Sequence, residues 1–106
     1  MVARGEVWLA RLDPTEGREI QKTRPCLVVS PLEINEHLDT LIVVPMTQGS
    51  WPARYRIEAT LNGKAGRFLL EQIRAIDKSR LLRKLGTVEP ETLASTLNAL
   101  RAMFVE

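Results

Sequence analysis

Cysteine and histidine are almost absent from this sequence of 106 residues, which holds one of each, Cys26 and His37. A single cysteine excludes an internal disulfide and a cysteine-clustered zinc site. No group of carboxylates stands at metal-ligand spacing, so no metal site is expected. A hydrolase triad is also excluded, because His37 has no obvious acidic orienter and no nucleophile-elbow sequence is present. Phosphate-binding loops and dinucleotide fingerprints are missing, which leaves no expected cofactor.

Long apolar runs are missing too. The N-terminus lacks the apolar segment of a secretion signal, and no run approaches membrane-spanning length. Together with the lone cysteine, this predicts a cytoplasmic protein with no membrane partner. The formal net charge of +2 is mildly basic, so any contact with nucleic acid should be a local patch. The length favours a single domain over residues 1–106, which no repeat, low-complexity tract or linker divides.

What the chain does contain is a series of short apolar segments rich in β-branched residues. They predict six strands, at residues 5–12, 24–30, 40–47, 53–60, 67–76 and 85–88. Pro45 implies an edge, a bulge or the end of a ladder in the third strand. The pair Asn62-Gly63 predicts a hairpin, with a loop longer than two residues. Cys26 stands among apolar neighbours and is expected in the core.

Three helical segments are expected as well. Ser30, Pro31 and Glu33 have the spacing of a capping box that opens a short helix ending near His37. A single helical turn is expected at 77–82. From Pro90 onward, one amphipathic helix is predicted, with an apolar stripe that is either core or partner surface, formed by Leu93, Leu97, Leu100, Met103 and Phe104. This order predicts an α+β, mainly β fold, in which an antiparallel sheet curls into a small barrel covered by the C-terminal helix.

Charged and polar residues form pairs at three places along these strands. Two pairs lie at or near the end of a strand, and the third interrupts the apolar pattern of a strand. Side chains of this kind, held at the mouth of a rigid sheet, commonly position chemistry on phosphates. The three pairs are Glu19 with Arg24, Thr47 with Gln48, and Glu71 with Arg74.

Five segments in order resemble the MazF/PemK (Kid-like) toxins of bacterial toxin–antitoxin modules. They are Arg-Gly-Glu-Val-Trp at 4–8, Asp-Pro-Thr-Glu-Gly-Arg-Glu at 13–19, Thr-Arg-Pro at 23–25, Val-Pro-Met-Thr-Gln-Gly at 44–49, and Leu-Glu-Gln-Ile-Arg-Ala-Ile-Asp at 70–77. The resemblance implies an SH3-like barrel, shared with CcdB-type proteins, and a homodimer. It also implies metal-independent cleavage of single-stranded RNA, such as mRNA, and neutralisation by a cognate antitoxin encoded elsewhere.

The reaction that the resemblance implies is attack of a ribose 2′-hydroxyl on the adjacent phosphate, which leaves a 2′,3′-cyclic phosphate and a 5′-hydroxyl end. Arg24 is then the stabiliser of the phosphorane and a candidate acid, and Thr47 hydrogen-bonds the same phosphate. A protonated guanidinium cannot serve as the base, so a carboxylate should, either Glu19 or Glu71. Further RNA contacts are expected from Arg18, Gln21, Lys22, Gln48, Trp51, Arg54 and Arg74.

The sequence departs from the PemK/Kid pattern at two positions. Arg18 stands where that branch has a catalytic histidine, and Leu69 stands where it has an arginine. The acid and base roles of that branch therefore cannot all be assigned to the matching positions of this chain. The pattern is nearer the MazF branch, which relies on the arginine before the proline, here Arg24, and on the threonine after the third strand, here Thr47.

Two other functions remain open from the sequence. A CcdB-like gyrase poison would share the barrel, but its activity depends on a tryptophan near an apolar C-terminus, and this chain has none after Trp51. A catalytically silent SH3-like binding module is the second alternative. Trp51 itself is expected either to stack on a base, a contact worth roughly 1–3 kcal/mol, or to pack against Pro52 or a dimer partner.

Overall fold

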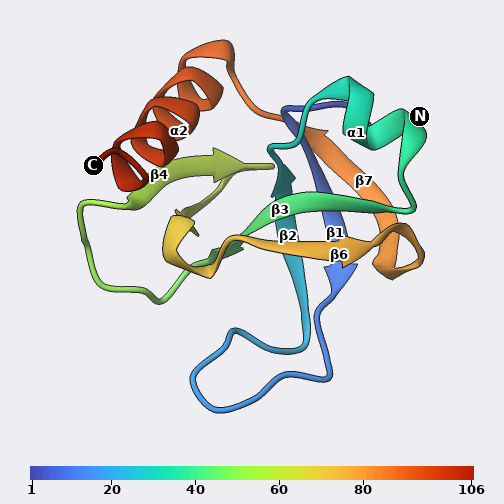
Figure 1. The fold of residues 1–106 in the computed structure, drawn as a ribbon. Coiled ribbons are helices and arrows are strands. Elements are labelled where there is room, and N and C mark those ends of the chain that lie inside the picture. The colour runs from blue at the N-terminus through green and yellow to red at the C-terminus, as the bar shows by residue number, and fades with distance from the viewer.

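A computed structural model describes all of residues 1–106 and shows seven strands, two α-helices and two 3₁₀ turns (Figure 1). The strands are β1 (Glu6–Arg11), β2 (Thr23–Val28), β3 (Thr40–Thr47), β4 (Arg56–Leu61), β5 (Lys64–Leu69), β6 (Arg74–Asp77) and β7 (Leu81–Thr87). The helices are α1 (Leu32–His37) and α2 (Pro90–Met103), and the 3₁₀ turns are η1 (Leu70–Gln72) and η2 (Lys78–Arg80). No helix is both long enough and apolar enough to cross a membrane.

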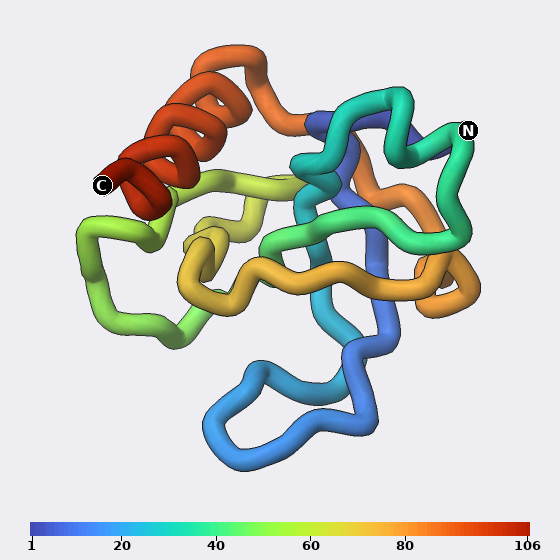
Figure 2. Tube along the Cα trace, in the orientation of Figure 1, coloured from blue at the N-terminus to red at the C-terminus, as the bar shows by residue number.

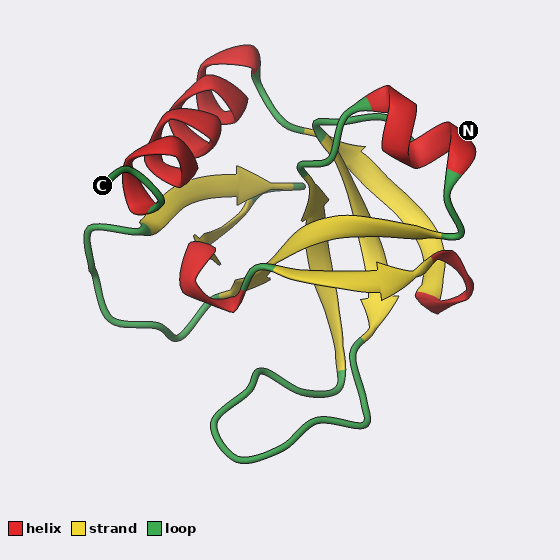
Figure 3. Cartoon of the chain, viewed as in Figure 1, coloured by secondary structure: helices red, strands yellow, loops and turns green.

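The strands form one antiparallel sheet in the order β4-β5-β3-β2-β1-β7, with β6 also paired to β3. β3 is the central strand, because it pairs with β2 along one edge and with β6 and β5 along the other. The sheet curls on itself, and α2 lies across β4 (Figure 3). The connection between β1 and β2 extends away from the body of the molecule (Figure 2). The predicted curled antiparallel sheet with a C-terminal helix is confirmed.

Two apolar clusters fill the two faces of the central strands, because successive side chains of a strand point to opposite sides. Leu27 and Val44 belong to the first cluster, which also contains Phe68 and receives Leu100 from α2. Cys26, Val28 and Val43 belong to the second. Cys26 is fully buried, as predicted, and burial raises the pKa of its thiol to about 12, with the nearby charge of Arg74 opposing this in part.

The long helix begins and packs as its sequence predicts, with one exception. Leu100 is buried, and Leu97 and Met103 pack against the first cluster. Phe104, which was included in the same stripe, lies beyond the last helical residue and is 70% exposed. Phe104 therefore lies outside the helix and the core, which leaves a partner surface as the remaining alternative for its ring.

The prediction of one continuous strand at residues 67–76 is wrong. The chain breaks into β5 and β6, which pair with different halves of β3. The three residues of η1 separate them, and Leu70, the first of these, is fully buried. The apolar pattern of this segment does not distinguish a buried turn from a buried strand, so the break could not be seen in the sequence.

The predicted loop of the Asn62-Gly63 hairpin is also wrong. β4 ends at Leu61 and β5 begins at Lys64, which leaves a two-residue connection. Asn62 and Gly63 have φ of 51° and 80°, the positive values that asparagine and glycine tolerate best in tight hairpins. Two boundaries also differ, since β4 begins at Arg56 rather than near residue 53, and β7 begins at Leu81 rather than near residue 85.

The predicted capping box is also wrong. α1 ends at His37 as expected, but Pro31 occupies the N-cap position and no side chain caps the helix. The Ser30 hydroxyl instead donates to Asn35 Oδ1 at 2.6 Å and accepts from the Ile42 backbone N–H at 3.0 Å. Ser30 is buried, so its hydroxyl joins α1 to β3 rather than satisfying the first turn of the helix.

Pro45 lies where the β2–β3 ladder ends, at the pair Cys26–Pro45. On the opposite edge of β3, the pairing with β6 runs to Val43 and the pairing with β5 begins at Met46, so Pro45 falls in the gap. A residue without an N–H is tolerated at such a point. Of the three alternatives, the end of the ladder is the one observed.

Candidate active site

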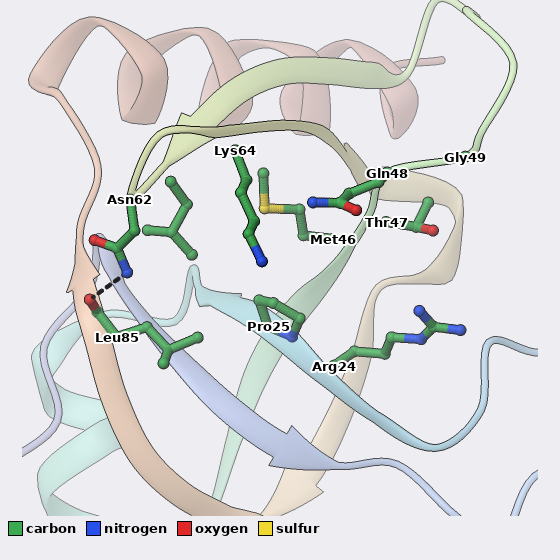
Figure 4. Close-up of a pocket in the computed structure, with 10 residues that line it drawn as sticks. Arg24, Pro25, Met46, Thr47, Gln48, Gly49, Asn62, Lys64 and Leu85 are labelled. Atoms are coloured by element: carbon green, nitrogen blue, oxygen red, sulfur yellow. Dashed lines mark hydrogen bonds between the residues drawn. The ribbon is translucent and has the colours of Figure 1, made fainter.

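Arg24 and Thr47 lie at the same end of two neighbouring strands. Arg24 is the second residue of β2, and Thr47 is the last residue of β3. Each stands two residues beyond the final pair of the β2–β3 ladder, in the same antiparallel register. Both are half-buried and line one cavity of about 430 Å³. Figure 4 shows their side chains on the same side of this cavity.

The guanidinium of Arg24 is partly free. Its Nε donates a hydrogen bond to the backbone carbonyl of Gln21 at 3.2 Å, which orients the group. No carboxylate forms an ion pair with Arg24. Its two terminal nitrogens therefore remain available to an anion, and a guanidinium presents them in the planar fork that matches phosphate oxygens.

The rest of this cavity combines apolar walls with three polar side chains. Pro25, Met46, Leu61 and Leu85 supply apolar surface, and Gln48, Asn62 and Lys64 supply polar groups. Sequence reasoning predicted Gln48 and missed both Asn62 and Lys64. The available signal was the tight Asn-Gly turn, which places the first residue of β5 opposite the end of β4.

A second cavity, of about 480 Å³, gathers four of the other predicted residues, including both candidate carboxylates. It is lined by Arg18, Glu19, Glu71, Gln72, Ile73 and Arg74. The predicted acid–base and phosphate-binding residues are thus divided between two cavities, with the Arg24–Thr47 pair in the first and both candidate carboxylates in the second.

Two hydrogen bonds, each between a backbone group and a side chain, hold the β1–β2 connection beside the second cavity. The Ile20 N–H donates to Gln72 Oε1 at 3.3 Å, and Arg74 Nη1 donates to the Leu12 carbonyl at 3.4 Å. These contacts join the connection to η1 and β6, which lie more than fifty residues away in the sequence. They place Glu19 and Arg18 beside Arg74.

The two candidate carboxylates differ in their partners. Glu71 Oε2 accepts hydrogen bonds from Arg56 Nε at 3.1 Å and Nη2 at 2.7 Å. Glu19 Oε1 accepts from the Glu16 backbone N–H at 2.6 Å and has no cationic partner. Each carboxylate therefore has one oxygen without a hydrogen bond, but Glu71 is ion-paired to Arg56, a residue that sequence reasoning did not single out, whereas Glu19 is not ion-paired.

Four predicted RNA-binding residues line neither cavity: Gln21, Lys22, Trp51 and Arg54. Trp51 is 83% exposed and does not pack on the core. Arg54 lies over the Tyr55 ring, 5.2 Å from its centre. Arg56 and Arg67 donate to the backbone carbonyls of Trp51 and Ser50, at 3.1 and 2.7 Å, and so hold the connection that carries these side chains.

No group of three or more histidine, cysteine, aspartate or glutamate residues could hold a metal ion. His37 is on the surface, as expected, with its side chain 75% exposed and Glu36 4.0 Å away.

Comparison with known proteins adds family information to this geometry. A family model described as PemK-like, MazF-like toxin of type II toxin–antitoxin system matches residues 3–104. Endoribonuclease PemK of Escherichia coli is 42% identical over 96 residues, which cover 85% of this chain and 71% of that protein. MazF from Deinococcus radiodurans has a similar structure, with a TM-score of 0.87 at 23% identity over 96% of this chain and 94% of that one. An endoribonuclease from a mycobacterial species, solved with its cognate antitoxin, has a TM-score of 0.81 at 22% identity over 96% and 93%.

Proposed function

Since this chain belongs to the PemK-like, MazF-like toxins of type II toxin–antitoxin systems and is an endoribonuclease, we propose that it cleaves single-stranded RNA at a site centred on Arg24 and Thr47. Residues 1–106 would form one toxin domain, acting on mRNA in the cytoplasm and so inhibiting translation and growth. The family match confirms the resemblance inferred from residues 4–77.

The single observation that supports this site is the shared cavity of Arg24 and Thr47. A cation and a hydroxyl from different strands line one space, and the cation has no carboxylate partner. Preorganised donors of this kind stabilise the extra negative charge that develops on phosphorus during the reaction. The lining of this cavity therefore suits binding of the scissile phosphate.

In the proposed reaction, a carboxylate removes the proton from the ribose 2′-hydroxyl, and the 2′-oxygen attacks the adjacent phosphorus. The bond from phosphorus to the 5′-oxygen breaks, which leaves a 2′,3′-cyclic phosphate and a 5′-hydroxyl end. No metal ion is required, because Arg24 and Thr47 supply the donors to the phosphate. We propose water, rather than the candidate acid Arg24, as the proton source for the departing oxygen, because a guanidinium that hydrogen-bonds the phosphate keeps its proton.

We assign the role of base to Glu19 rather than to Glu71. Glu19 has no cationic partner, whereas Glu71 already accepts two hydrogen bonds from Arg56. Arg18 and Arg74 line the same cavity as Glu19 and would bind neighbouring phosphates. Gln21, Lys22, Trp51 and Arg54 would contact RNA outside the cavities, with the exposed Trp51 as a stacking surface.

A cognate antitoxin is the proposed protein partner, and a second copy of the chain is expected to complete a homodimer. The support for the antitoxin is the mycobacterial relative of similar fold that was solved with its own antitoxin. An acidic tail with apolar anchors would suit the cationic rim formed by Arg18, Arg24 and Arg74, and would exclude RNA from it.

The test is digestion of a labelled single-stranded RNA in the presence of EDTA. We expect cuts whose upstream fragments carry 2′,3′-cyclic phosphates and whose downstream fragments carry 5′-hydroxyl ends. Intact RNA would contradict the proposal and favour the alternative of a catalytically silent SH3-like binding module. Inhibition of DNA gyrase without RNA cleavage would instead support the CcdB-like alternative.

A further inference from the structure

Two arginines on neighbouring strands hold consecutive carbonyls of the connection between β3 and β4, residues 48–55. Arg67 of β5 donates through Nη1 to the Ser50 carbonyl at 2.7 Å. Arg56 of β4 donates through Nη1 to the Trp51 carbonyl at 3.1 Å. We propose that Arg56 and Arg67 are positioning residues, which fix this connection so that Trp51 is presented to RNA as a rigid stacking surface. This inference rests on the proposed function and extends it to how the RNA-binding surface is built.

The connection has few other contacts that would fix it. It contains no helix or strand, and most of its residues are exposed (Figure 3). No backbone N–H donates to the carbonyl of Ser50 or of Trp51. The nearest turn bond runs from the Arg56 N–H to the Ala53 carbonyl at 3.1 Å. The two guanidiniums are therefore the only hydrogen-bond donors to the carbonyls of residues 50 and 51.

Each arginine is itself fixed by a carboxylate. Glu71 accepts from Arg56 Nε at 3.1 Å and from Nη2 at 2.7 Å, and Glu58 accepts from Arg67 Nη2 at 3.0 Å. Arg67 and Glu58 lie directly opposite each other in the β4–β5 register. A guanidinium suits this task because its five N–H donors point in fixed directions, so one group can bind a carboxylate and a carbonyl together. Each guanidinium thus links the connection to a carboxylate held by β4 or η1.

Neither arginine is placed to bind RNA as a free cation. The side chains of Arg56 and Arg67 are 25% and 21% exposed, and each is ion-paired. Neither lines the cavity of Arg24 and Thr47. Their effect on RNA therefore passes through the connection that they hold, rather than through a contact with phosphate.

Trp51 is the side chain whose presentation depends on these contacts. It is 83% exposed and belongs to neither apolar cluster, so packing on the core does not fix it. A large exposed ring with no role in the core suits stacking on an unpaired base. A connection that is held in one conformation before RNA arrives avoids the entropy that a mobile loop would lose on binding, and this raises affinity.

The test is a double-mutant cycle on binding of an uncleavable 2′-O-methyl oligonucleotide, measured by fluorescence anisotropy. Arg56→Met removes the guanidinium, and Trp51→Ala removes the ring. We expect either change to weaken binding roughly tenfold, the scale of one base–aromatic stack. In the Trp51→Ala protein, Arg56→Met should weaken binding little further, because its effect operates through the ring. Arg67→Met should behave in the same way and replaces Arg56→Met in the cycle if that variant does not fold.

Two further variants separate positioning from charge. Arg83→Met makes the same change of charge at an exposed position of β7, and it should bind nearly as the wild type does. Arg56→Lys keeps the charge, but a single nitrogen lacks the planar fork that joins Glu71 to the Trp51 carbonyl, so it should bind as weakly as Arg56→Met. With a cleavable RNA, Arg56→Met should raise KM with little change in kcat.

Three results would overturn the inference. The first is wild-type affinity in Arg56→Met, Arg56→Lys or Trp51→Ala. The second is an additive loss of affinity in the double variant, which would mean that the arginine contacts RNA itself. The third is absence of binding by the wild type. Failure of the proposed function is seen separately, as binding of the oligonucleotide without cleavage of RNA.

Discussion

Arg56 donates two hydrogen bonds to one carboxylate oxygen of Glu71, from Nε at 3.1 Å and from Nη2 at 2.7 Å. The same guanidinium donates through Nη1 to the Trp51 carbonyl at 3.1 Å. Arg56 thus joins η1 to the connection between β3 and β4, which carries Gln48 and Trp51. Glu71, a candidate base from the sequence, is thereby linked through Arg56 to this connection.

Substitution of the two carboxylates should separate these roles. Glu19→Gln keeps the size of the side chain and should reduce the single-turnover cleavage rate by about 100- to 10,000-fold, the usual contribution of a general base. Glu71→Gln retains a neutral acceptor for Arg56 and should affect KM for RNA more than kcat. Initial rates across RNA concentrations provide the measurement. A greater loss of kcat in Glu71→Gln than in Glu19→Gln would reverse the assignment.

Removal of the donors to the phosphate should abolish most activity without unfolding the protein. Arg24→Ala should reduce kcat by about 100- to 1,000-fold, since it removes a donor aimed at developing charge. Thr47→Val removes the hydroxyl with little change of shape and should also lower kcat. Arg83→Ala is the matched control, because Arg83 is exposed on β7 and lines no cavity near the site. Full activity in a folded Arg24→Ala protein would remove Arg24 from the mechanism.

Gly66→Ala should disturb the site through packing alone. A Cβ at this position would lie 2.8 Å from Met46 Cε and 3.0 Å from the Thr47 carbonyl oxygen. Overpacking of this kind typically costs 1–3 kcal/mol and shifts the backbone, here next to Thr47. We expect a lower free energy of unfolding in urea and slower RNA cleavage. Gly86→Ala is the control, since its Cβ would meet only Leu61 at an ordinary 3.5 Å, and it should change both quantities little.

Glu6 should make the stability depend on acid pH. Burial of this carboxylate would raise its pKa, but hydrogen bonds from the Ala3 N–H, Trp8 Nε1 and Lys84, together with the Lys84 charge, outweigh burial and lower the pKa below 4.5. The charged form therefore stabilises the fold above pH 4.5, and this contribution is lost as the pH falls through the lowered value. Glu6→Gln should reduce the free energy of unfolding by about 1 kcal/mol at pH 7.

At a pH below the folded-state pKa of Glu6, the wild type and Glu6→Gln should have the same stability, because both side chains are then neutral. Urea unfolding at the two pH values measures the difference. A constant gap between the proteins at both values would show that charge is not the cause.

Cys26 should be inert in the folded protein. Its side chain is fully buried and its thiol pKa is about 12, so almost no thiolate exists at neutral pH. Alkylation by iodoacetamide should therefore be slow in native buffer and fast in urea, with mass spectrometry as the readout. Rapid labelling of the native protein at pH 7 would mean that the second apolar cluster opens readily.

The sequence by itself determined most of the architecture. β-branched runs such as residues 40–47 and the periodic apolar residues after Pro90 specify their own local structure, since a strand repeats every two residues and a helix every 3.6. The pairing of Arg24 with Thr47 came from the resemblance to the MazF branch, although each residue also stands at an end of a predicted strand. The break at η1 could not be identified from the sequence, because a buried turn and a buried strand bury the same apolar residues.

Tertiary structure alone decided which charges meet. Whether Glu71 faces Arg56, and whether Lys64 reaches the cavity of Arg24, depends on how β5 turns away from β3 and on the two-residue hairpin. These contacts join residues from different strands, and one extra residue in a turn would move each side chain to the other face of the sheet. Local composition does not predict such contacts, because these ion pairs and cavities form only once the strands are paired in register.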